Sequence, residues 1–307
     1  MDERIPVAES VSRAWAEVAN GARMTNHMLT SMPSLTAASN FAQIDAVYAY
    51  EKASDWHRAY LAAALEHLVV WADFAAPLRF HPEHEVTFTF RPAHTLGRAA
   101  MEAASQAVWM TAGGTAQECA RRRLALIRWD YAEHRKSQAD LTFKERIAQL
   151  DARLLDRASD VFDESDLRPP SHLTVLRAAA PVVGLDPDEV EEVWRAASGA
   201  AHGRNWASIA LQHVVPLEEY EPGHLKTLRV PDPGPMTDVL RIAEKMTTYG
   251  VLRHADFRQA DIGRMIEQSR LWLSSVIPFR DDADAATVAL LKRPVEPTSA
   301  GPNPTAR

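Results

Sequence analysis

The sequence predicts a mainly α-helical protein, a multi-helix bundle of about eight helices with a small β insertion of two or three strands. Three observations predict this class. Apolar side chains recur at helical spacing along most of the chain, and residues that start or stop helices stand at the ends of those stretches. Only short segments alternate β-branched and aromatic side chains as strands do. We expect one helical domain over residues 1–277 and a disordered tail over 278–307.

The composition is typical of a water-soluble globular protein that folds without metals or disulfides. Hydrophobic residues make up 46% of the 307 residues and charged residues 24%, so a sizeable core can form. The formal net charge of -7 argues against nucleic-acid binding through a general excess of basic charge. Cys119 is the single cysteine, which excludes an internal disulfide and indicates a reducing compartment. With no apolar leader and no run long enough to cross a bilayer, we expect a cytoplasmic protein without a membrane partner.

In the first part of the chain we expect three helices and one short strand. Pro33 ends the first helix, and Ser39 caps a long second helix. That second helix carries His57, which we place on the surface. Gly113 stops the third helix. The expected elements are helices over 8–32, 39–75 and 94–112, and a strand over 86–90.

The rest of the chain continues the helical pattern and supplies the partners that the first strand needs. Pro187 after Asp186 is a strong helix start, and Gly250 separates the two closing helices. The helices over 116–136 and 141–162 are expected to form an antiparallel hairpin. The remaining expected elements are helices over 171–183, 187–201, 236–249 and 257–276, and strands over 207–215 and 225–230.

Two charged clusters are assigned no chemistry. The side chains of Arg121–Arg123 point in different directions around their helix, and acidic neighbours offset their charge, so we expect a solvated face. Contact with RNA is the more specific alternative. The group His81, Glu83, His84 matches no zinc spacing, and we expect no metal site. No cofactor is expected either, because the sequence contains no glycine-rich phosphate loop, GxSxG elbow or HExxH motif.

The segment 194–206 is the densest cluster of chemically capable side chains. Arg195 and His202 are seven residues apart, which is two helical turns, so they are expected to project from one face. Such a face can bind an anion or phosphate, with a forked donor and a group that moves protons near neutral pH. Its small residues equally suit close helix packing, with His202 capping the helix. The accompanying candidate binding residues are Trp194, Ser198, Arg204, Asn205 and Trp206.

A second polar stripe lies on the helix over 94–112. Arg98 and Glu102 are one turn apart, with apolar residues on the opposite face. A buried arginine or glutamate needs a partner. We therefore expect Glu102 to meet Arg195 or His202 across the bundle.

These two segments carry a resemblance to known proteins. Arg98-x-x-x-Glu102, followed by Arg-x-x-Ser-Gly-x-Ala-His-Gly from Arg195, resembles helical proteins of actinobacteria, and more distantly the HEPN superfamily. HEPN ribonucleases are helical, often dimeric, and cleave RNA without metal through an Arg-x(4–6)-His motif. The resemblance implies that Arg195 holds the scissile phosphate while His202 assists the attacking or leaving oxygen.

The sequence therefore supports two functions. The first is a helical interaction or small-ligand-binding protein with a polar site between helices, formed by Arg98, Glu102, Arg195 and His202. The alternative is a HEPN-like, metal-independent ribonuclease of a bacterial defence or toxin–antitoxin system, with Arg195, His202 and Glu102 as its catalytic residues. RNA is the partner in the second case, and a homodimer is left open in both.

Overall fold

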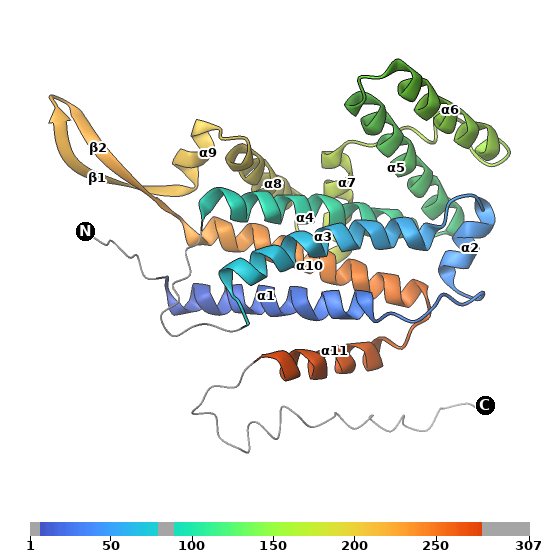
Figure 1. Cartoon of the computed structure of the whole chain (residues 1–307), viewed down its shortest axis with the longest axis horizontal. Helices are drawn as coiled ribbons and strands as arrows, with labels where there is room; N and C mark the ends of the chain where they lie inside the picture. The colour runs from blue at the N-terminus through green and yellow to red at the C-terminus, as the bar shows by residue number, and fades with distance from the viewer. Residues whose placement is uncertain (1–6, 79–88, 278–307) are drawn as a thin grey trace.

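The chain folds mainly into α-helices, with one small antiparallel sheet (Figure 1). The computed structural model describes residues 7–78 and 89–277, so the expected tail and the group around His81 lie outside the described residues. In chain order the elements are α1 (Glu9–Thr30), α2 (Asn40–Val47), α3 (Ala53–Ala75), α4 (Phe90–Thr111), α5 (Ala116–Ser137), α6 (Leu141–Ala158), α7 (His172–Ala179), the 3₁₀ helix η1 (Ala180–Val183), α8 (Pro187–Ala201), α9 (Asn205–Ala210), β1 (Gln212–Glu221), β2 (His224–Pro231), α10 (Pro233–Phe257) and α11 (Ile262–Val276).

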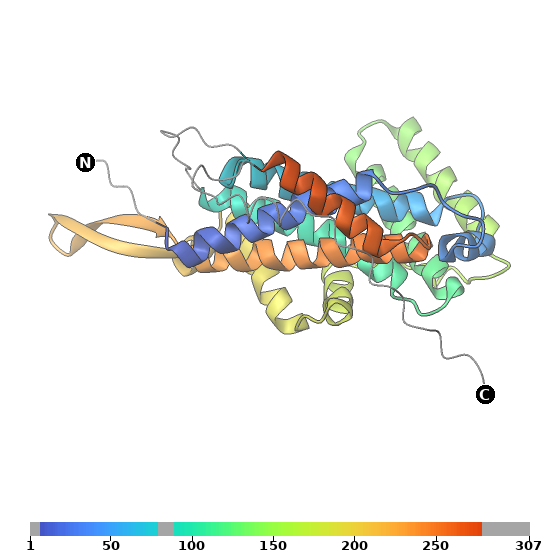
Figure 2. The same ribbon diagram turned by 90° about the horizontal axis from the view of Figure 1, so that it is seen from below.

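Helices α1, α3, α4 and α10 run side by side and form the central bundle (Figures 1 and 2). Apolar side chains of all four helices share one buried cluster, in which Leu68, Met101 and Met246 are fully buried. Helices α4 and α10 approach closely at a glycine: a Cβ on Gly97 of α4 would lie 3.0 Å from the side chain of Val239 of α10. The sequence therefore produces the predicted bundle by burying one apolar stripe from each helix.

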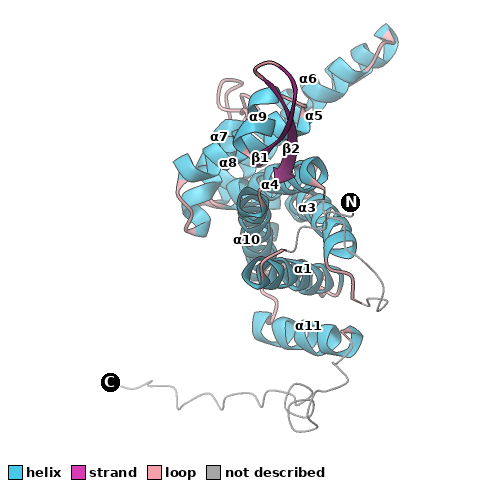
Figure 3. Ribbon diagram, turned by 90° about the vertical axis from the view of Figure 1, so that its left-hand side faces the viewer, coloured by secondary structure: helices cyan, strands magenta, loops and turns pink. Residues whose placement is uncertain are grey.

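The other elements surround this bundle. Helices α7 and α8 pack on the far side of α4, so α4 is enclosed between them and the central bundle, while α11 lies against α1 (Figures 1 and 3). Helices α5 and α6 form the predicted antiparallel hairpin near one end, beside α2. Among the described residues, no helix combines the length and hydropathy that crossing a bilayer requires.

The expected second helix is divided into α2 and α3, and the buried side chain of Arg123 on α5 explains the division. Its guanidinium donates to the carbonyl oxygens of Tyr48 (2.9 Å) and Glu51 (2.5 Å), so these carbonyls bind a charged group in the break between the helices. Arg123 also donates to Asp45 (3.0 Å), whose carboxylate accepts from the backbone N–H of Ala53 (2.8 Å) where α3 begins. Arg123 is fully buried, so it is not part of a solvated face.

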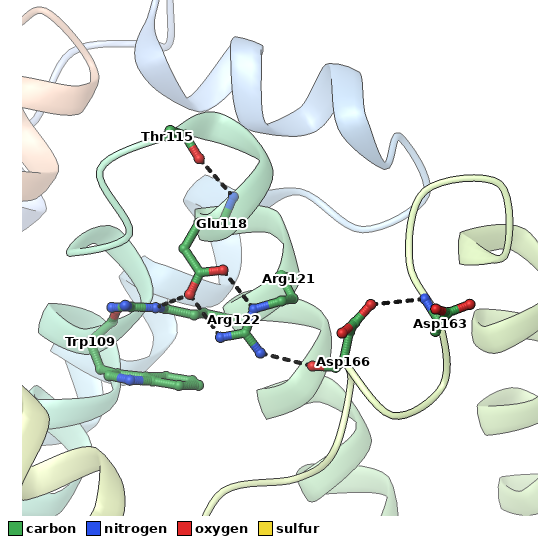
Figure 4. Close-up of polar contacts among 7 residues, drawn as sticks. All are labelled: Trp109, Thr115, Glu118, Arg121, Arg122, Asp163 and Asp166. Atoms are coloured by element: carbon green, nitrogen blue, oxygen red, sulfur yellow. Dashed lines mark hydrogen bonds and ion pairs between the residues drawn. The ribbon is translucent and has the colours of Figure 1, made fainter.

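The other two arginines of that run converge on Glu118 (Figure 4). Its carboxylate accepts from Arg121 (2.6 Å) and Arg122 (2.7 Å), and these bonds lower the pKa of Glu118 to about 2. Arg121 also donates to the carbonyl oxygen of Asp166 after α6, and Arg122 to that of Trp109 near the end of α4. The arginine run therefore joins separate elements of the fold.

Two expected junctions between elements are wrong. Phe90 begins α4 instead of ending a strand, and 86–88 lie outside the described residues. α10 continues through Gly250, where a Cβ would lie 2.6 Å from the end of the Leu61 side chain of α3, so the glycine leaves space for that side chain. The turn to α11 instead contains Gln259, which has a φ of 59°.

The two late strands are confirmed as a hairpin, although its first expected residues are helical. Residues 207–210 belong to α9, and β1 starts at Gln212, which pairs with Pro231. Regular pairing continues to Pro216 opposite Thr227, beyond which the register shifts. The hairpin projects away from the end of the bundle (Figures 1 and 2).

Two histidines meet in the core, so the expectation that His57 lies on the surface is wrong. His57 of α3 and His254 of α10 are fully buried, and their Nδ1 atoms are 3.0 Å apart. Nε2 of His57 lies 3.4 Å from the hydroxyl of Thr111, whereas Nε2 of His254 has no partner. Burial lowers the pKa of His57 well below its ordinary value and that of His254 to about 3. The pair is therefore neutral at pH 7.

Arg123→Met is expected to destabilise the protein by about 3–5 kcal/mol, the usual cost of leaving one partner of a buried ion pair alone. The substitution leaves the Asp45 carboxylate without the guanidinium that binds it in the core. Urea unfolding measures the loss, with Arg135→Met, an exposed position near the end of the same helix, as control. Equal stabilities of the two variants would contradict this role for Arg123.

Acid is expected to destabilise the protein through the buried histidine pair. An unfolded histidine protonates near pH ~6.5, and the lowered pKa of His57 and His254 means that the unfolded state binds more protons below that pH. Stability is therefore undiminished above pH ~6.5 and falls toward pH 3 by up to ~1.4 kcal/mol per pH unit for each group. Urea unfolding at several pH values should show a shallower decline for His254→Leu than for wild type or the exposed-site control His134→Leu. Parallel declines in all three would exclude the pair as the source.

Candidate functional site

The polar stripe on α4 forms one half of the candidate site. Arg98 and Glu102 are one turn apart, and Nε of Arg98 donates to Oε1 of Glu102 (2.9 Å). Their side chains are only 20% and 17% exposed, so the ion pair is largely shielded from water. It lies on the face of α4 that packs against α8.

Helix α8 supplies the other half through Trp194 and His202. The indole N–H of Trp194 donates to the same Oε1 of Glu102 (2.7 Å), and the Arg98 guanidinium lies over the Trp194 ring, 5.6 Å from its centre. Nη1 of Arg98 lies 3.3 Å from Nε2 of His202, which caps the end of α8 and is exposed. We name these four residues, Arg98, Glu102, Trp194 and His202, the α4–α8 corner.

The Arg98–His202 contact suits one tautomer of the imidazole. A guanidinium has only N–H donors, so Nε2 of His202 is the acceptor in this hydrogen bond, and the neutral tautomer that matches it has its hydrogen on Nδ1. Within the described residues, Nη2 of Arg98 makes no hydrogen bond. At the α4–α8 corner, Nη2 of the charged Arg98 guanidinium is therefore still available as a donor, next to the exposed His202.

Arg195 does not join this contact, contrary to the face expected from sequence. Its guanidinium donates to Glu191 one turn back along α8 (Nε, 2.7 Å), and Arg177 of α7 binds the other oxygen of the same carboxylate. The expected contact of Glu102 with Arg195 or His202 is therefore wrong. Glu102 binds Trp194 instead, and it is Arg98 that contacts His202. Arg195 still borders the corner, with its guanidinium 6.0 Å from the centre of the Trp194 ring.

The remaining predicted residues lie around the end of α8 without closing a site. Arg204, Asn205 and Trp206 are exposed where α9 begins, and Ser198 is partly buried. Trp206 packs on Gly199, where a Cβ would lie 2.6 Å from the indole ring. Trp194 and Trp206 therefore occupy different places: one is inside the corner and the other covers the joint between α8 and α9.

Two residues near the corner were not predicted. Arg91 of α4 donates to Ser208 of α9 (3.3 Å), which ties the start of α4 to the short helix. His94, one turn before Arg98, is buried with neither ring nitrogen hydrogen-bonded, and burial lowers its pKa to about 4. Neither could be found from sequence, because the helical period gives the buried face of α4 but not which helix covers it.

Basic charge gathers at this end of α4 although the whole chain is acidic. The arginines on the segments that meet here are Arg91 and Arg98 of α4, Arg195 of α8 and Arg204 before α9. Glu102 and Glu191 each bind a member of this arginine group, whereas Arg91 and Arg204 form no ion pair within the described residues. Such a patch favours an anion over a cation.

No metal site accompanies these groups in the part of the chain that the structure describes, where no three His, Cys, Asp or Glu side chains gather as ligands. No protein-family model matches the chain, and no curated protein or solved structure matches it either. The side chains of the α4–α8 corner therefore carry the functional inference.

Glu102→Gln is expected to lower the free energy of unfolding by about 1–3 kcal/mol, because a shielded guanidinium loses its charged acceptor and the Trp194 indole bond weakens. Arg195→Ala, which breaks an exposed pair on the same side of the molecule, should leave stability nearly unchanged. Urea unfolding compares the two variants. A larger loss in Arg195→Ala would show that the contacts at the corner are not the ones that hold α8.

Proposed function

We propose that this chain is a helical binding protein that takes a small anionic ligand, through a carboxylate or phosphate group, at the α4–α8 corner. The observation that carries the proposal is Arg98, whose guanidinium is fixed by Glu102 and His202 while its Nη2 makes no hydrogen bond within the described residues. A guanidinium held in place loses little freedom when an anion binds it, and its planar fork suits carboxylate and phosphate oxygens.

The surroundings of Arg98 favour an anion in two further ways. Trp194 supports the guanidinium from one side by a cation–π contact, and exposed His202 stands beside the open donor. Arg195 and Arg204 add positive charge from the neighbouring turns. The lone Cys119 is buried, and we place this activity in the cytoplasm on the ground that the chain cannot form an internal disulfide.

The bacterial, HEPN-like ribonuclease is the second candidate, favoured by the 3.3 Å contact between a fixed arginine and an exposed histidine. In this version Arg98, rather than Arg195, turns its donors to the phosphate, which releases Nε2 of His202 to accept the proton of the 2′-hydroxyl and return it to the leaving 5′-oxygen. RNA cleavage by wild type that disappears in both Arg98→Gln and His202→Ala supports this candidate. Binding of phosphate with no cleavage favours the small-ligand function.

Arg98→Gln is expected to abolish stabilisation by inorganic phosphate, and Glu102→Gln to increase it, because the first removes the donor and the second removes the competing carboxylate. A ligand that binds only the folded state raises its stability by RT ln(1 + [L]/Kd). The measurement is the rise of the unfolding temperature with phosphate, at an ionic strength held constant with chloride.

The matched control is Arg128→Gln. Arg128 is a similarly shielded arginine bound to a carboxylate, Asp151, but it lies between α5 and α6. This variant should respond to phosphate as wild type does. An unchanged phosphate effect in Arg98→Gln would overturn the proposed site.

A further inference from the structure

The hydrogen bond between Arg98 and His202 forms only while the imidazole is neutral. Nε2 of His202 lies 3.3 Å from Nη1 of Arg98, and a guanidinium can only donate, so the bond needs the lone pair on Nε2. A protonated imidazole has no such lone pair, because both of its nitrogens donate. Without a bound anion, a proton on exposed His202 therefore breaks this bond and leaves two cations side by side.

An anion on Arg98 reverses this unfavourable effect of the proton. The donor Nη2, which makes no hydrogen bond within the described residues, belongs to the same guanidinium that His202 contacts through Nη1. An anion that binds this guanidinium therefore places a negative charge beside the imidazole. A nearby negative charge favours the charged form of a histidine, whereas a nearby positive charge disfavours it. Anion binding at the α4–α8 corner and protonation of His202 therefore favour each other.

The Arg98–His202 contact has charged neighbours on α4, on α8 and in the turn before α9. Within two helical turns of the contact along the chain, these charged or titratable residues are Arg91, His94, Glu102, Arg195 and Arg204. Glu102 and Arg195 are bound in ion pairs, and burial lowers the pKa of His94 to about 4. Of the two histidines, His202 is therefore the one that can gain a charge between pH ~5 and ~8.

Charged groups of α7 and α10 meet α8 near its beginning. Arg177 of α7 binds Glu191, and burial together with Glu189 raises the pKa of Asp238 of α10. Glu189 and Glu191 lie three turns or more before His202 on the same helix. Helix α9, which also packs on α8, contains no charged residue. These groups therefore do not compete with Arg98 for the imidazole.

We propose that an anion and a proton bind the α4–α8 corner together, the anion on Arg98 and the proton on Nε2 of His202. This regulation rests on the proposed function. Nε2 takes the proton from the solvent and releases Nη1 of Arg98, so that the imidazolium and the guanidinium both donate to the anion. The proton returns to the solvent when the anion leaves. Because the bound state holds more protons than the free state, affinity for the anion rises as the pH falls.

Calorimetric titration of the full chain with sulfate tests this linkage. The charge of sulfate stays constant over the pH range used, whereas that of a phosphate group changes. Direct titration reports binding to the folded protein, so the expected acid sensitivity of its stability does not enter. We expect the Kd for sulfate to fall about tenfold between pH ~8.5 and ~6. Near pH ~7.5 the heat of binding should vary with the ionisation enthalpy of the buffer, in the direction of proton uptake.

His202→Gln is the discriminating variant, because a glutamine carbonyl can accept from Arg98 but gains no charge. It should bind sulfate with an affinity that does not change with pH, whereas His134→Gln, at an exposed position on α5, should keep the wild-type profile.

Three results would overturn the linkage and leave the proposed anion site standing. They are wild-type binding without pH dependence or proton uptake, a pH dependence that survives in His202→Gln, and binding of phosphate without binding of sulfate. The last would show that His202 stays neutral and accepts from an O–H of the ligand. Failure of both anions to bind at any pH would instead overturn the proposed function, and the linkage with it.

Discussion

Helix α4 is enclosed by the central bundle on one side and by α7 and α8 on the other, so its buried polar side chains need partners on α4 itself or on the helices packed against it. Arg98 and Glu102 meet this requirement through Trp194 and His202 of α8. The ion pair therefore does more than occupy a polar face: it fixes where the end of α8 lies. That position in turn sets α9, to which Arg91 is bound.

The chain contains a second arginine node, and the difference between the two indicates which one can bind a ligand. Arg123 has no exposed surface, and its two amino groups are used by Asp45 and by backbone carbonyls in the break between α2 and α3. Arg98 is 20% exposed and retains a donor that makes no bond in the described structure. The contacts of Arg123 therefore leave no access for a ligand, whereas the Arg98 guanidinium is held in place and still accessible on one side.

Much of the fold could be predicted from sequence, since apolar periodicity and end signals such as Pro187 after Asp186 act locally. The failures have non-local causes. No local pattern reveals that Arg123 would bind carbonyls between α2 and α3, or that Leu61 would need the space at Gly250. His57 was misplaced for the same reason, since its partner is about two hundred residues away on α10.

The candidate site was predicted in part. Spacing brought Arg98 and Glu102 together, and the segment 194–206 was correctly linked to them, because a polar stripe on an enclosed helix needs partners. Spacing could not choose between Arg195 and Trp194 as the residue that turns inward. An acidic residue one turn before Arg195 offered it a nearer partner, and the indole was left for Glu102.

The most direct test of the account is a phosphate titration followed by the indole ¹H–¹⁵N signals of the tryptophans. Trp194 donates to Glu102 and lies against Arg98, so an anion on Arg98 must change its environment. We expect a saturable shift of the Trp194 signal, with the signals of Trp56 on α3 and Trp129 on α5 unmoved. A Trp194 signal that stays fixed, or that drifts linearly together with those of Trp56 and Trp129, would contradict it.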